Sequence, residues 1–151
     1  MAPPEPAAAG AAGPRPSPLH LGELREKSAD LSDIVKVTEL TPDLLDVQAK
    51  QVHTELVMPA YSWLKDEVAR ACGADWAVSD QQRLKAKYAT AARKWPAYRQ
   101  AVQELESART HGRSEVIAQR RLETPRDEYI IALASFAVEV SAVLNKFFPG
   151  P

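Results

Sequence analysis

Histidine and cysteine, the side chains most often used in metal binding and catalysis, are few in this chain and widely separated. The histidines are His20, His53 and His111, and Cys72 is the single cysteine. A metal site on helices needs ligands three or four residues apart, because only that spacing places them on one helical face. His20 and His111 each have a glutamate at that spacing, but no second ligand pair accompanies either, and His53 and Glu55 point to different sides. The sequence therefore predicts no metal site and no cofactor.

Motifs of enzymatic catalysis are also missing. The chain has neither a glycine-rich phosphate loop nor a Gly-x-Ser-x-Gly elbow. Cys72 comes just before Gly73 at the predicted C-terminus of a helix, where the helix dipole disfavours a thiolate. A lone cysteine allows no internal disulfide, which is typical of intracellular proteins. We therefore expect a non-catalytic protein located in the cytoplasm or the nucleus.

The first 18 residues differ sharply in composition from the rest. Six of them are proline, six alanine and two glycine, so the segment has little apolar surface to bury and is predicted to be disordered. It also lacks the basic and apolar regions of a secretory signal. The sequence therefore predicts a Pro/Ala-rich tail over residues 1–18 and one helical domain over residues 19–151.

Helical periodicity is clearest in the middle of the chain. Apolar residues there alternate four and three apart, which is typical of a long helix packed against helical neighbours. They are Leu84, Tyr88, Ala91, Trp95, Tyr98, Val102 and Leu105. Weaker periodicity predicts a first helix over residues 20–37. Thr41 and Pro42 predict the start of a second helix, which runs to Cys72 and rotates its apolar face near Pro59.

Capping signals set the remaining boundaries. Ser79, with Gln82 three residues later, forms the pattern of a capping box at the start of the third helix, and Gly112 ends that helix. We expect a short helix over residues 114–122, followed by a last helix that Thr124 caps and Pro125 begins. The predicted fold is an all-α, up-and-down four-helix bundle with proline-bent helices behind a disordered N-terminal tail.

Charge is segregated along the chain. Residues 19–79 carry eleven acids and six bases, whereas residues 80–113 carry eight bases and three acids. We expect the basic third helix to pair with the acidic second helix. Because its aromatic residues lie on the predicted core stripe, they are not available to stack on bases, and we expect no specific nucleic-acid binding.

The last helix is unusually apolar: fifteen of the twenty residues from Tyr129 to Phe148 are apolar, which is close to a membrane span in length. Glu128, Ser135, Glu139 and Lys146 fall on one narrow arc, and only Ser141 and Asn145, neither of them charged, lie off it. This pattern favours a helix largely surrounded by protein.

The function predicted from the sequence is that of a non-catalytic protein–protein interaction module, an adaptor or a subunit of a larger assembly. The excess apolar surface of the last helix predicts a protein partner or self-association. The residues expected to pack and to contact the partner are Tyr129, Ile130, Phe136, Val140, Phe147 and Phe148. One alternative is membrane association through the basic helix at 80–110 or through the C-terminal helix. Another is a small-molecule-binding bundle or an enzyme with scattered site residues.

Overall fold

The computed structural model describes residues 21–149, which are 92% helical and contain no strand. In chain order the helices are α1 (Leu21–Leu40), α2 (Asp43–Gln51), the π-helix η1 (Val52–Val57), α3 (Met58–Cys72), the 3-10 turn η2 (Gly73–Asp75), α4 (Val78–Thr110) and α5 (Glu115–Phe147). The predicted tail, residues 1–18, lies outside the described residues.

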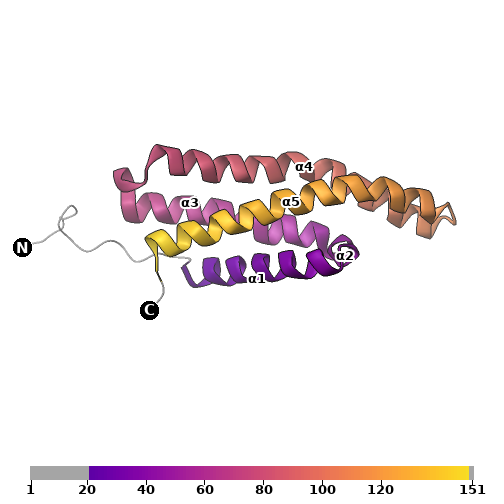
Figure 1. Ribbon diagram of the computed structural model, residues 1–151, viewed down its shortest axis with the longest axis horizontal. Coiled ribbons are helices and arrows are strands. Elements are labelled where there is room, and N and C mark those ends of the chain that lie inside the picture. Colours follow the sequence, from indigo (N-terminus) through magenta and orange to yellow (C-terminus); the bar gives the residue numbers. More distant parts are fainter. Residues whose placement is uncertain (1–20, 150–151) are drawn as a thin grey trace, which may run out of the picture.

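The helices form an elongated up-and-down bundle (Figure 1). Since α2, η1 and α3 continue one another, they act as a single second member, and α1, α4 and α5 are the other three. The interface between α4 and α5 is the most extensive, and α5 also packs along α1 and α3. The predicted four-helix bundle is thereby confirmed.

The second member changes its buried face within the π-helix. Pro59 has no N–H, and in an α-helix its ring would clash with the carbonyl four residues earlier, that of Glu55. The wider π-turn, in which the Met58 N–H bonds to the His53 carbonyl, replaces that regular turn. The carbonyl of Glu55 accepts a hydrogen bond from Lys27 Nζ of α1 at 2.9 Å. The predicted rotation near Pro59 is therefore produced by the residues just before it.

Two predicted boundaries are wrong. α5 is one 33-residue helix with Pro125 inside it, so Thr124 and Pro125 do not begin a separate last helix. Leu122 and Tyr129 on either side of the proline are buried against α4, and this packing outweighs the roughly 3 kcal/mol cost of an internal proline. α4 begins at Val78 without a side-chain cap, so the predicted capping box of Ser79 is not formed.

Other helix ends agree with the sequence. Gly73 and Gly112 adopt the positive φ angles of 54° and 66° that glycine tolerates best. Behind Gly112, the N–H of Arg113 bonds to the carbonyl of Ala108 at 2.9 Å, which closes the turn between α4 and α5. The start of α2 differs from the prediction, because the Thr41 side chain accepts no capping hydrogen bond and the helix begins at Asp43 with Pro42 at the N-cap position.

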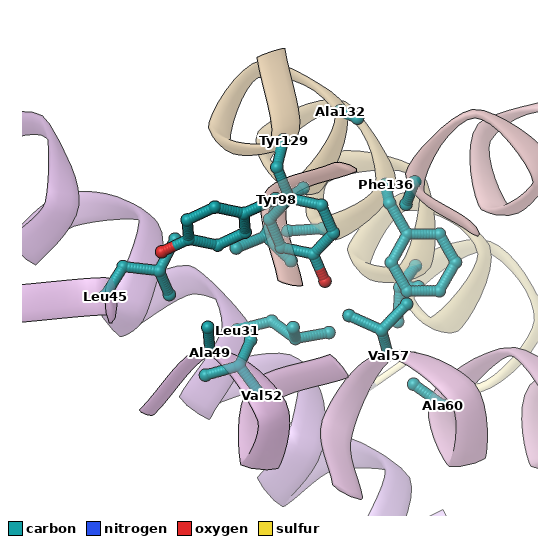
Figure 2. Packing of buried hydrophobic residues seen from close by; sticks show 14 of the residues in the cluster. Leu31, Leu45, Ala49, Val52, Val57, Ala60, Tyr98, Tyr129, Ala132 and Phe136 are labelled. Carbon is teal, nitrogen blue, oxygen red and sulfur yellow. The ribbon is translucent and has the colours of Figure 1, made fainter. Parts of the chain in front are cut away.

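Buried and half-buried apolar residues alternate along α4, on the stripe that its heptads predict. The residues seven apart, Leu84, Ala91, Tyr98 and Leu105, are buried, whereas Tyr88, Trp95 and Val102 between them are half-buried. In the middle of the bundle, Tyr98, Tyr129 and Phe136 are fully buried. Figure 2 shows their rings against Leu31, Val52 and Val57 of the neighbouring helices.

The α4–α5 hairpin is longer than the rest of the bundle. Each of its helices has 33 residues, about 50 Å at 1.5 Å per residue, whereas the 20 residues of α1 span about 30 Å. The end of the hairpin therefore projects beyond α1 and α2 (Figure 1). Over this projecting end, α4 and α5 bury apolar residues mainly against each other, including Ala108 and Ala118.

Candidate functional site

A buried polar cluster joins α2, the π-helix, α4 and α5. Asp46 accepts hydrogen bonds from Tyr98 Oη at 2.5 Å and from Arg126 Nη1 at 2.9 Å. His53 Nδ1 and Tyr129 Oη share a hydrogen bond of 2.7 Å. The rings of Tyr98 and Tyr129 stack with centroids 5.3 Å apart, which makes these two pairs one cluster.

Trp95 forms the outer wall of this polar cluster. Its ring stacks on His53 with centroids 4.7 Å apart and an interplanar angle of 11°. Trp95 was predicted to lie on the core stripe, and it is half-buried there. Trp95 therefore contributes to the packing of the bundle in two ways, by its partial burial and by its contact with the imidazole of His53.

Burial favours the neutral forms of His53, Tyr98 and Tyr129 in this cluster, whereas Asp46 and Arg126 form an ion pair. Desolvation lowers the pKa of His53 from 6.5 to about 4, so its imidazole is neutral at pH 7. Desolvation also raises the pKa of Tyr129, and burial followed by the Asp46 hydrogen bond raises that of Tyr98. A neutral imidazole stacked under Trp95 and two protonated phenols suit a structural network that fixes helix register.

Sequence reasoning missed Asp46 and Arg126, and it considered His53 only as a metal ligand. A signal for His53 was present. It lies four residues after Ala49 and four before Val57, so it joins the apolar stripes on either side of the π-helix. A polar residue on a continuous buried stripe indicates a buried hydrogen bond. Arg126 offered no comparable signal, because its burial depends on α5 continuing through the preceding proline.

The polar arc of α5 faces α4. Glu128 pairs with Lys94 at 3.2 Å and Glu139 with Arg83 at 3.1 Å, while Lys146 pairs with Asp80 at 2.7 Å. The carboxylate of Glu139 is buried within this row of ion pairs.

The sequence predicted that the basic helix, α4, pairs with the acidic second helix. For the α4 bases that form ion pairs with α5, this prediction is wrong. Arg83 and Lys94 of α4 reach α5, as does Arg109, which pairs with Glu115 at 3.4 Å. The reason is geometric, since α4 and α5 run side by side over their whole length. The acids of α5 are therefore nearest to these bases.

The predicted partner residues divide into two groups. Tyr129, Phe136 and Val140 are fully buried inside this bundle, so in the folded chain they have the predicted packing role and offer no exposed surface to a partner. They follow one another at helical spacing on the inner face of α5. Ile130, Phe147 and Phe148 are half-buried at the edge of the core.

The outer face of α5 carries two exposed apolar residues that are not among the predicted partner residues. Ile131 is 71% and Val138 70% exposed. α5 is also the one described helix that is long and apolar enough to cross a membrane, although 44% of the relevant window is buried in the bundle. A core helix of a soluble protein meets the same criterion.

Exposed apolar side chains gather at the corner where α1 meets α2. Val37 and Leu40 end α1, and Leu44 and Val47 follow on α2; their exposed fractions are 45%, 86%, 47% and 82%. We call these four residues the α1–α2 corner. Four such residues within eleven positions form a patch of the kind that marks a contact surface.

A groove of about 650 Å³ runs from this corner to the projecting end of the α4–α5 hairpin. Leu44 and Val47 line it on the α2 side. Val102, Leu105 and Leu122 form its apolar wall on the hairpin side. A smaller hollow of about 120 Å³ joins Val37 to Leu44, so the corner and the groove form one continuous surface.

The rim of the groove is acidic. Asp43, Glu106 and Glu123 line it and are exposed, and none of the three has an ion pair with another residue of the range 21–149. The two arginines in the lining are engaged, Arg126 with Asp46 and Arg109 with a glutamate of α5. The groove therefore presents free carboxylates beside the exposed apolar side chains of Leu44 and Val47.

Within residues 21–149, no group of three or more His, Cys, Asp or Glu side chains is placed to hold a metal ion. Cys72 is buried. No match was found when the chain was compared with protein-family models, curated proteins and solved structures. Function must therefore be inferred from the surfaces themselves.

Proposed function

We propose that this chain is a non-catalytic protein-interaction module that binds through the α1–α2 corner and the adjoining groove. The observation that carries the proposal is the gathering of Val37, Leu40, Leu44 and Val47 beside an apolar groove. In the free protein these apolar side chains are exposed to water, and a partner that covers them would bury them.

The shape and chemistry of the groove favour a helical partner segment. An amphipathic helix binds by placing apolar side chains in a groove while its polar flanks meet the rim. Here Leu44 and Val47 are the exposed apolar residues of the lining, and the rim carries Asp43, Glu106 and Glu123. A segment with an apolar face and basic flanks is the complementary ligand.

A matched pair of substitutions tests this proposal. Val47→Asp places a charge in the corner, whereas Val138→Asp makes the same change on the outer face of α5 at similar exposure, 70% against 82%. Each is combined with a photo-cross-linking residue at Gln119, which lines the groove, in cells that produce the protein naturally. We expect Val47→Asp to abolish the cross-linked protein adducts and Val138→Asp to leave them unchanged. Unchanged adducts in both variants would contradict the proposal.

Membrane association through α5 is a second candidate, supported by the length and hydropathy of this helix. Ile131 and Val138 would be the residues that meet lipid first, because they are the exposed apolar residues of its outer face. Flotation with anionic vesicles tests it. Binding that Val138→Asp removes and Val47→Asp leaves intact would favour the membrane over the groove.

A further inference from the structure

The projecting end of the hairpin carries a second surface, which we call the tip. It consists of the exposed apolar residues Val116 and Ile117, 56% and 51% exposed, together with the exposed arginines Arg113, Arg120 and Arg121. None of these arginines has an ion pair with another residue of the range 21–149. The tip is therefore a short helical segment with an apolar centre and basic flanks.

The tip and the groove are complementary in charge and in apolar character. The groove offers the exposed apolar residues Leu44 and Val47 and the free rim carboxylates of Asp43, Glu106 and Glu123. The tip offers the apolar pair Val116 and Ile117 between unpaired arginines. Each surface has the chemistry that the other would recognise.

The tip cannot fill the groove of its own chain. The tip lies on α5, the same helix that supplies Gln119, Leu122 and Glu123 to the groove, so it cannot fold back into it. At about 100° per residue, Ile117 and Arg121 lie at least about 100° around α5 from those three residues, and they line a separate hollow of about 350 Å³. Ile117 and Arg121 therefore point away from the groove of their own chain.

We propose that the groove is occupied by the tip of a second copy of this chain. In this arrangement Val116 and Ile117 enter the groove beside Leu44 and Val47 of the other copy, and the arginines meet its rim carboxylates. The inference rests on the proposed function, because it names the occupant of the same groove. The groove is lined by residues from the same end of the α4–α5 hairpin that carries the tip, so two copies can exchange them about a two-fold axis and form a closed dimer.

Charge reversal in the groove or in the tip tests whether two copies exchange their tips. The groove variant carries Glu106→Lys and Glu123→Lys, and the tip variant carries Arg120→Glu and Arg121→Glu. Alone, each brings like charges together in both contacts of the dimer, which we expect to weaken it at least about a hundredfold. Mixed in equal amounts, the two variants have opposite charges in both contacts. The mixture should therefore form a heterodimer although each variant alone is monomeric.

Sedimentation equilibrium measures these outcomes for the full chain, from micromolar to about millimolar concentration. We expect twice the chain mass of 16.6 kDa for the wild type and for the mixture, and the single chain mass for each variant alone. The control with Lys85→Glu and Arg93→Glu, on the exposed side of α4, should remain dimeric. Recovery in the mixture also shows that both variants are folded.

Three results would overturn the second-copy inference: a monomeric wild type, a dimer that survives both reversals, or a mixture that stays monomeric. None of them decides the proposed function. If the wild type is monomeric and Val47→Asp still abolishes the cross-linked adducts, then the groove binds another protein. If neither association nor adducts depend on the corner, both proposals fail.

Discussion

The body of the bundle and the projecting end of the hairpin differ in how many helices are available to bury their apolar residues. In the body, α5 packs against α1, α3 and α4, and Tyr129 and Phe136 are fully buried. At the end, α4 and α5 have mainly each other, and Val116 and Ile117 stay exposed. The body buries its large aromatic residues within one chain and leaves Ile131 and Val138 exposed on the outer face of α5, whereas the end has only two helices to bury its apolar residues and leaves Val116 and Ile117 exposed beside unpaired arginines.

The largest effect expected from this comparison is on stability. Phe136→Ala removes a fully buried ring from the body and should lower the free energy of unfolding by about 3–5 kcal/mol. Ile117→Ala, at 51% exposure in the tip, should cost less than about 1 kcal/mol in dilute solution. Urea denaturation followed by circular dichroism measures both. Equal losses would show that body and end do not differ.

A smaller effect concerns pH and the buried His53. Its folded-state pKa is lowered from 6.5 to about 4, so between these values the unfolded state binds more protons than the folded state. Stability is therefore full above pH 6.5, falls as the pH drops, and levels off for this group below about pH 4. The loss should reach about 2–3 kcal/mol by pH 4.

Urea denaturation between pH 4.5 and 7.5 isolates this contribution. His53→Gln should flatten the slope over that range. The matched change His111→Gln, at an exposed histidine after α4, should leave the slope as it is. A slope that is the same in all three proteins would mean that His53 protonates freely in the folded chain.

The smallest effect on stability is expected at the α1–α2 corner. Val47 is 82% exposed, so Val47→Asp should change the free energy of unfolding by no more than about 0.5 kcal/mol in dilute solution. Thermal unfolding at micromolar concentration checks this. A loss of several kcal/mol would show that the corner supports the fold instead of serving as a contact surface.

The sequence predicted most of the fold and little of the binding surface. Heptads from Leu84 to Leu105 and glycine at the helix ends depend on local geometry, which the sequence displays directly. Continuation of α5 through Pro125 depends on packing against α4, which no local signal reports. The aromatic residues expected to bind a partner, such as Phe136, are buried because α5 turns its charged arc toward α4. The groove arises from the different lengths of the helices and the corner between α1 and α2.

Hydrogen exchange tests the central claim most directly, because it reports the body and the projecting end in one sample. In dilute solution, amides over residues 104–122 should exchange much faster than those around Tyr98 and Phe136, since fewer elements pack on the end. At high protein concentration, or with a bound partner, residues 104–122 and 40–47 should become protected together while the body is unchanged. An end that is as protected as the body in dilute solution, or that gains no protection on association, would contradict the claim.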